Sequence, residues 1–108
     1  MAQIKWQSGA KQHFRQIFEY YVQQASMTVA LSFEATIFEY IERLYDFPLL
    51  GKLDTSFSTE ETQYYFLVVR WRRRVYKIYY VFEDDVCYIQ AIWDCSMNPE
   101  KLPEWLLD

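Results

Sequence analysis

Glycine, proline, cysteine and histidine are all scarce in this chain, which has two, three, two and one of them among 108 residues. So little glycine and proline excludes a disordered linker, and the length predicts one domain over residues 1–108. No apolar run reaches the ~18 residues that cross a membrane. Residues 1–11 also lack the apolar core of a secretory signal. We therefore predict a single cytoplasmic domain with no membrane contact.

The two cysteines fall eight positions apart in what reads as one strand. Along a straight strand, Cys87 and Cys95 would be roughly 26 Å apart, whereas a disulfide requires Cα atoms within about 7 Å. They are therefore predicted to be buried free thiols in a reducing compartment. The single histidine, His13, lies far from both in sequence, so we expect no metal site and no cofactor. At the edge of a helical apolar stripe, it is predicted to be solvated rather than catalytic.

The charge is unevenly distributed. The formal net charge is −4, yet residues 63–82 contain no acidic side chain and hold five of the eleven basic ones. Together with one tryptophan they form what we call the basic tip: Arg70, Trp71, Arg72, Arg73, Arg74 and Lys77. Charge runs are commonly solvated faces. Arginine and tryptophan are nevertheless enriched at binding hot spots, so we predict that the basic tip binds a partner, and an acidic one.

Apolar spacing predicts six main elements. Residues 3–6 alternate as a strand, and stripes at intervals of three and four predict helices over residues 9–24 and 29–45. Ser8 is the expected cap of the first helix, and Ser26 or Thr28 that of the second. Residues 47–51, with Pro48 and Gly51, are expected to plug the helices onto the sheet, and residues 53–62 to form a loop. Strands follow over residues 63–71, 75–82 and 86–93, joined by Arg72-Arg73 and by residues 83–85.

This order, β-α-α-β-β-β, predicts a two-layer α+β fold in which an antiparallel sheet packs against an α-helical hairpin. Period-two alternation assigns two sets of side chains to the core: Tyr76, Ile78, Tyr80 and Phe82, and Cys87, Ile89, Ala91, Trp93 and Cys95. Tyr79 and Val81 share the face of Lys77, which makes the outer face of the sheet a candidate partner surface.

Several motifs, taken in order, resemble the RelE/ParE toxins of bacterial type II toxin–antitoxin modules, the class that includes plasmid stabilisation proteins. They are Trp6 with Ser8, the paired helices, Leu44…Phe47-Pro48…Gly51, Val75-Tyr76-Lys77-Ile78-Tyr79-Tyr80, and Ile92-Trp93-Asp94…Asn98-Pro99-Glu100-Lys101-Leu102. The resemblance implies a small toxin silenced by a cognate antitoxin. RelE-like members cut mRNA on the ribosome, and ParE-like members poison DNA gyrase.

RNA cleavage needs a general base, a general acid and cations for the charged intermediate. The resemblance places Arg72 where RelE-like enzymes carry a basic residue, but Ser96 stands where they carry an arginine. This departure argues against nuclease activity. Asp94 and Arg72 are the only weak catalytic candidates, and Asp94 also reads as a carboxylate that bonds turn amides.

Our leading prediction is a toxin that acts by binding a target, of gyrase type or undetermined. The alternatives are a ribosome-dependent mRNA endonuclease and a non-toxic module that binds the antitoxin. The oligomeric state of the free chain stays open. A helix start is expected at Asn98-Pro99, and the apolar tail Trp105-Leu106-Leu107 is expected to dock on the body rather than contact another chain.

Overall fold

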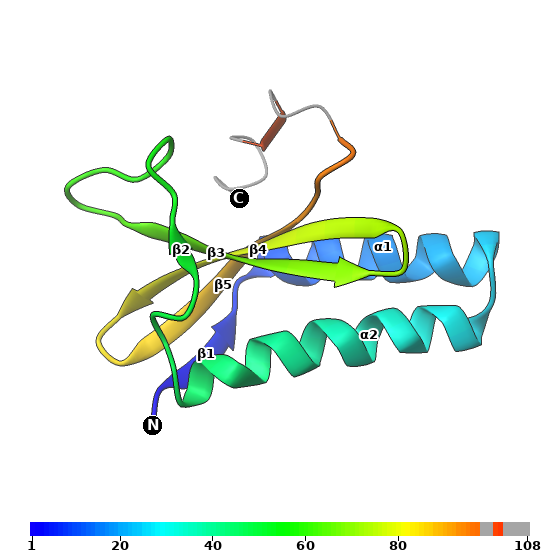
Figure 1. The fold of residues 1–108 in the computed structure, drawn as a ribbon, viewed down its shortest axis with the longest axis horizontal. Coiled ribbons are helices and arrows are strands. Elements are labelled where there is room, and N and C mark those ends of the chain that lie inside the picture. Colours follow the sequence, from blue (N-terminus) through cyan, green and yellow to red (C-terminus); the bar gives the residue numbers. More distant parts are fainter. Residues whose placement is uncertain (98–100, 103–108) are drawn as a thin grey trace.

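The computed structural model describes residues 1–97, 101 and 102; the predictions for Asn98-Pro99 and for the apolar tail lie outside them. The helices and strands run in the predicted order, with one short strand added (Figure 1). They are β1 (Gln3–Trp6), α1 (Ser8–Gln24), α2 (Met27–Glu42), the 3₁₀ turn η1 (Arg43–Tyr45), β2 (Lys52–Leu53), β3 (Tyr64–Trp71), β4 (Arg74–Glu83) and β5 (Val86–Asp94).

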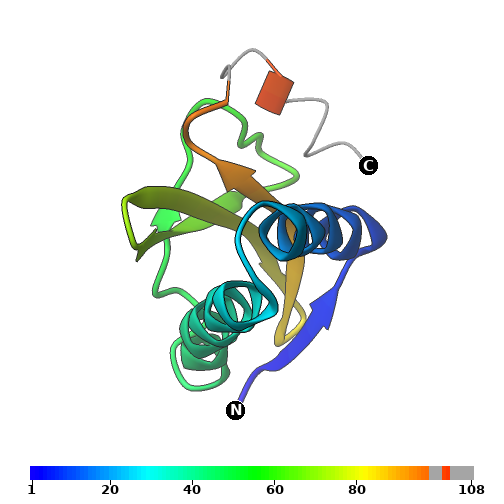
Figure 2. The same ribbon diagram turned by 90° about the vertical axis from the view of Figure 1, so that its right-hand side faces the viewer.

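The sheet has the strand order β1-β5-β4-β3-β2, and the two helices cover one of its faces (Figure 2). Strands β3, β4 and β5 form the predicted antiparallel meander. β1 joins the edge of β5 in parallel, and β2 pairs antiparallel with β3 through only two residues. The predicted two-layer α+β fold is confirmed, with a sheet that is mixed because of β1. No described helix has both the length and the apolarity to span a bilayer.

The two helix starts differ in how they are capped. Ser26 caps α2 as predicted, because its Oγ accepts a hydrogen bond from the Val29 amide at 3.1 Å. The predicted cap of the first helix is wrong. Ser8 lies inside α1, and Gln7 is the cap residue without a side-chain hydrogen bond. Lys11 N instead bonds to the carbonyl of Gln7, so the helix begins without a side-chain acceptor.

The core between the helices and the sheet is largely aromatic. The Phe33 ring of α2 is fully buried and contacts the rings of Tyr21, Trp71 and Tyr76. His13 also belongs to this interior. It is 4% exposed, and its Nδ1 accepts a hydrogen bond from the Ile92 amide at 3.3 Å. The prediction of a solvated histidine is therefore wrong, because α1 turns this side chain onto β5.

A β-bulge reverses the faces of β5. Tyr80 pairs with Ile89 but Tyr79 pairs with Ala91, so Gln90 has no partner across the ladder. Before the bulge, Cys87 and Ile89 face the helices as predicted. After it, a one-residue shift exchanges the two faces of a strand. Ala91 and Trp93 therefore lie in a second cluster on the opposite face, and Cys95 is exposed. Ala91 and Trp93 are buried as predicted, but the prediction that they share a face with Cys87 and Ile89 is wrong, as is the prediction that Cys95 is buried.

The outer face of the sheet is partly covered. Tyr79 is 1% exposed and packs in the second cluster with Trp93 and Leu102. The loop after β2 contributes Phe57 to this cover. Its turn is held by the Asp54 carboxylate, which accepts hydrogen bonds from the Ser56 and Phe57 amides at 2.8 and 3.0 Å. The predicted open surface at Tyr79 is therefore wrong.

The corner between η1 and β2 packs differently from the prediction. Phe47, Leu49 and Leu50 are 65%, 57% and 49% exposed, so they do not plug the helices onto the sheet. Gly51 makes the close contact instead, because its amide donates a hydrogen bond to the Tyr80 hydroxyl at 2.9 Å.

Candidate functional site

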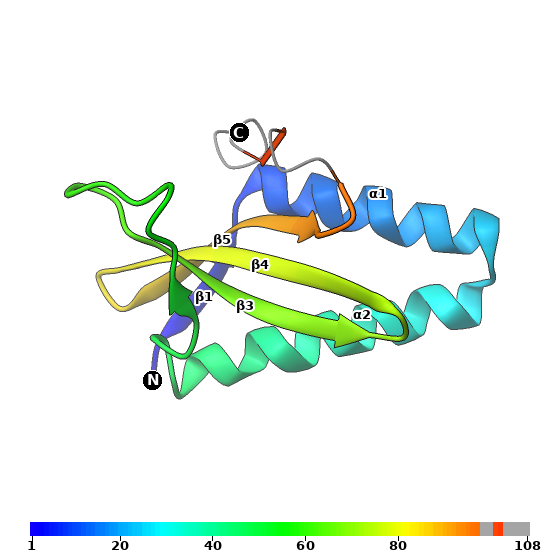
Figure 3. The same cartoon turned by 45° about the horizontal axis from the view of Figure 1, so that its top comes forward.

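The β3–β4 turn carries the basic tip. Trp71 pairs with Arg74 across the hairpin, so Arg72-Arg73 forms a two-residue turn, as predicted. Arg72 has φ 54°, a conformation that non-glycine residues adopt at some cost. Two-residue turns of this kind require a positive φ to match the strand twist. The turn between β3 and β4, which lies at one end of the sheet (Figure 3), therefore consists of two arginines.

Trp71 belongs to the core rather than to the surface of the tip. Its side chain is 6% exposed, its Nε1 donates to Ser32 Oγ at 3.2 Å, and its ring contacts Tyr21. The Arg72 guanidinium lies over the same ring, with Cζ 5.2 Å from the centroid. Trp71 therefore anchors the turn to the helices and offers only its outer ring face to the arginine.

The remaining cations divide between the two faces of the sheet. Directly paired residues share a face, so Arg74 points with Trp71 toward the helix side. Arg70 and Lys77 point to the opposite side, and Lys77 Nζ lies 4.6 Å from the Phe66 ring centroid. The structure therefore brings Arg70 and Lys77 to one face, places Arg74 on the other, and leaves Arg72 and Arg73 between them.

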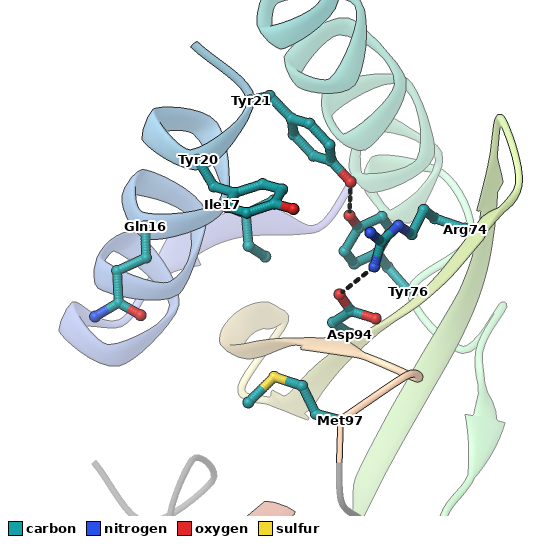
Figure 4. A pocket seen from close by; sticks show the side chains of 8 residues that line it. All are labelled: Gln16, Ile17, Tyr20, Tyr21, Arg74, Tyr76, Asp94 and Met97. Carbon is teal, nitrogen blue, oxygen red and sulfur yellow. Dashed lines mark hydrogen bonds and ion pairs between the residues drawn. The ribbon is translucent and has the colours of Figure 1, made fainter. Parts of the chain in front are cut away.

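Arg74 lines a pocket of about 360 Å³ that lies between α1, β4 and the end of β5 (Figure 4). Its walls come from α1, β4, the end of β5 and the following turn: Gln16, Ile17, Tyr20, Tyr21, Arg74, Tyr76, Asp94 and Met97. The Tyr21 and Tyr76 hydroxyls share a hydrogen bond. Burial and that bond raise the pKa of Tyr76 above its ordinary value. The pKa of Arg74 is also raised, chiefly by Tyr21, against the opposing effect of burial. The pocket therefore holds the Arg74 cation and the Asp94 carboxylate beside the hydrogen-bonded Tyr21 and Tyr76 hydroxyls.

Asp94 is engaged by three donors. Its Oδ1 accepts from the Ser96 amide at 2.9 Å and from Ser96 Oγ at 2.8 Å, and its Oδ2 lies 3.4 Å from Arg74 Nη1. These are the bonds of a carboxylate that closes a turn. Within residues 1–97, 101 and 102, no three His, Cys, Asp or Glu side chains could together hold a metal ion.

The comparison with protein families decides the class. The model of the ParE toxin of the type II toxin–antitoxin system parDE matches residues 4–99. The chain belongs to the ParE toxin family.

The fold of this ParE-family chain also has a solved counterpart. A chain of the chromosomal ParDE toxin–antitoxin system from P. aeruginosa superposes with a TM-score of 0.67. The two share 18% identity over 87% of this chain and 96% of that one. At this identity, the likeness supports the fold alone. No curated protein matches the sequence.

In this ParE-family chain, a guanidinium approaches the position at which Ser96 replaces the expected arginine. Arg74 Nη1 lies 3.5 Å from Ser96 Oγ. The positive charge beside Ser96 is thus supplied by Arg74 of β4 and not by a residue of the segment after β5. The sequence could not indicate this, because Arg74 and Ser96 are 22 positions apart and meet only through the β4–β5 pairing.

Sequence reasoning also missed the α1 wall of the pocket. Tyr20 is 51% exposed beside the buried Tyr21, and Gln16 lies one turn before it. The adjacent tyrosines at the end of the first helical stripe were the available signal. Aromatic side chains are common in the walls of ligand pockets.

Proposed function

We propose that this chain is the toxin of a type II pair, that it arrests growth by binding a protein target of the DNA gyrase type, and that a cognate antitoxin holds it inactive. The observation that carries the proposal is the ParE family model, which matches residues 4–99. The ParE-like branch of the resemblance is the one that acts on gyrase. Asp94 supports action by binding, because Ser96 and Arg74 already occupy both of its oxygens.

The basic tip supports recognition of an acidic partner. Arg70, Arg72 and Arg73 are exposed. Among the described residues, the ion pairs are Arg43–Glu39 and Arg74–Asp94, so these three arginines have no acidic partner there. Unpaired cations at an exposed turn accelerate and orient the approach of an acidic segment. We assign this role to the antitoxin.

Induced expression without antitoxin tests the toxic activity. We expect growth arrest, loss of gyrase supercoiling by the purified chain, and stable bulk mRNA. Normal growth would refute the toxic function and leave a module that only binds the antitoxin. Supercoiling that continues during arrest would refute the gyrase-type target.

One observation favours a second function, ribosome-dependent mRNA cleavage. The Arg74 guanidinium lies beside Ser96, where the nuclease branch of the resemblance carries an arginine. In that case, mRNA would be cut during arrest and Arg74→Gln would abolish the cutting. Arrest with intact mRNA would rule this function out.

Replacing Arg70, Arg72 and Arg73 together with alanine tests the role of the basic tip. The binding partner is the protein from the adjacent reading frame that restores growth. We expect its affinity to fall at least about tenfold, since charge pairs and steering are lost. The matched control replaces Lys11, Arg15 and Arg43, three exposed cations on the helices. Unchanged affinity of the tip variant would refute this role.

A further inference from the structure

The outer edge of β3 is only half covered. β2 pairs with β3 at Lys52↔Phe66 and Leu53↔Tyr65, and the pairing ends there. β3 continues to Trp71, beside α2 and without a neighbouring strand among the described residues (Figure 3). A strand edge of this kind presents backbone groups that can pair with another chain.

The groups that point outward can be identified from the pairing. The Tyr64 carbonyl accepts a hydrogen bond from the Asp54 amide at 2.7 Å, so the backbone groups of Tyr64 point away from β4. Alternate residues of a strand repeat this direction. The N–H and C=O groups of Phe66, which pairs with Lys52, therefore also point away from β4. The same holds for those of Val68 and Arg70, two and four positions further along β3. In the described part of the chain, no strand pairs with the N–H and C=O groups of Val68 and Arg70 on this side.

A groove of about 370 Å³ runs along this edge. It is lined by Tyr40, Leu50, Gly51, Lys52, Phe66, Leu67, Val68 and Arg70. None of these residues is acidic, and two are cations. Arg70 and Val68 lie on the outer face of the sheet, whereas Leu67 faces α2. The groove therefore has a cationic side at Arg70 and an apolar side at Leu67 and Tyr40.

We propose that this edge binds an extended acidic segment of the antitoxin by β-strand addition. This inference rests on the proposed function, which supplies the antitoxin. Residues that pair with Val68 and Arg70 place their side chains on the Arg70 face, where carboxylates are favoured. The residues between them point toward Tyr40 and Leu67, where apolar groups are favoured. The segment is thus an alternation of acidic and apolar residues, held by backbone hydrogen bonds.

The charge at this edge argues against a second copy of the chain. An edge-to-edge pair would bring the cations of two β3 strands together. Residues 63–82 contain no acidic side chain to compensate them. Like charges opposite one another on a sheet are unfavourable.

A synthetic peptide tests the proposal directly. The probe is an eight-residue fluorescent peptide that alternates valine and glutamate, and its binding is followed by fluorescence anisotropy. Methylation of the glutamate amides removes the donors that face β3, so we expect at least about tenfold weaker binding. Methylation of the valine amides alters only the outward side and is the matched control, which should bind as the parent does. Equal binding of the two methylated peptides would overturn strand addition.

Two variants of the protein test the same contact from the other side. Val68→Pro removes an edge donor that the β3–β4 ladder does not use, and Arg70→Glu reverses the local charge. Each variant should lower the affinity for the peptide about tenfold or more. Arg70→Glu keeps the test valid if the proline variant does not fold. Arg15→Glu, on the exposed face of α1, is the control. Unchanged binding by Arg70→Glu would overturn the proposed charge recognition.

Amide exchange distinguishes the other occupants of the edge. In the proposal, the Val68 and Arg70 amides exchange rapidly in the isolated chain and slowly with the peptide. Slow exchange in the isolated chain that becomes rapid on deletion of residues 103–108 would place the chain's own tail there and overturn the proposal. If the free chain forms a homodimer that Arg70→Glu dissociates, a second copy occupies the edge, and the proposal is likewise overturned. Growth arrest and gyrase inhibition need no antitoxin, so they fail or succeed independently of this edge.

Discussion

Replacement of Gly51 by alanine would test how the corner after the helices is fixed to the sheet. The Gly51 amide donates to the Tyr80 hydroxyl at 2.9 Å. A Cβ added at Gly51 would lie 2.8 Å from the Phe66 carbonyl oxygen, and also 2.8 Å from Cε1 and from Oη of Tyr80. Carbon atoms pack favourably only at about 3.5–4.0 Å. Because Tyr80 is fully buried, its ring has no free space into which to move.

The expected loss follows from these contacts. Forcing an extra carbon into a packed interior costs about 1–3 kcal/mol. Displacing the corner would also break the Gly51–Tyr80 hydrogen bond, which adds about 1 kcal/mol. We therefore expect Gly51→Ala to lower the free energy of unfolding by roughly 2–4 kcal/mol. For a domain of this size, that corresponds to a fall in Tm of roughly 10 °C or more.

Urea unfolding followed by tryptophan fluorescence measures this loss. Leu50→Ala is the matched control at the neighbouring position, since Leu50 is 49% exposed, and it should change stability by no more than about 0.5 kcal/mol. Tyr80→Phe should lose about 1 kcal/mol, because it removes the acceptor but adds no atom. A Gly51→Ala protein as stable as the parent would refute the close packing of the corner against Tyr80.

Three further predictions concern the thiols and a helix cap. A thiol reagent should label Cys95 in the folded protein and Cys87 only after unfolding, because Cys95 is exposed and Cys87 buried; peptide mass spectrometry reports the order, and equal labelling rates would contradict it. Burial raises the pKa of Cys87 from 9.0 to about 11. The unfolded chain therefore loses this proton first, and stability should fall by roughly 2 kcal/mol between pH 9 and 11. Urea curves should show a smaller fall for Cys87→Ala, and equal falls would refute this cause. Ser26→Ala should cost about 1 kcal/mol through loss of the α2 cap, and Ser26→Thr much less; an equal loss in both would exclude the cap as the cause.

The order of the helices and strands could be read from local patterns. The stripe that contains Phe33 and Ile37 has the helical period, and both side chains are fully buried against the sheet. The polar Arg72-Arg73 pair between two apolar runs forms the turn that it predicted. These features depend on neighbours within a few positions of the chain, which is why periodicity and turn chemistry suffice.

The faces of β5 could not be read in this way. The alternation from Cys87 through Trp93 is regular in the sequence, but the bulge at Gln90 interrupts it. A bulge arises from the pairing with β4 and not from the residues of β5 alone. The same limitation hid the burial of His13, whose hydrogen bond goes to Ile92, 79 positions away.

The candidate site was predictable in composition and not in arrangement. The sequence identified the six residues of the basic tip, but the sheet places Arg74 on the helix side and Arg70 on the other. The pocket at Arg74 combines side chains from α1, β4 and the turn after β5. Its walls therefore appear only when those elements meet.

The sequence alone determined which segments become helices, strands and turns, and it placed the chain in its toxin family through motifs spread along its length. Tertiary structure alone decided which strand lies beside which, where the β4–β5 ladder slips by one residue, and which half of β3 remains uncovered. The physical reason is that periodicity and capping are local free-energy preferences. Register, burial and open edges depend on contacts between residues far apart in the chain.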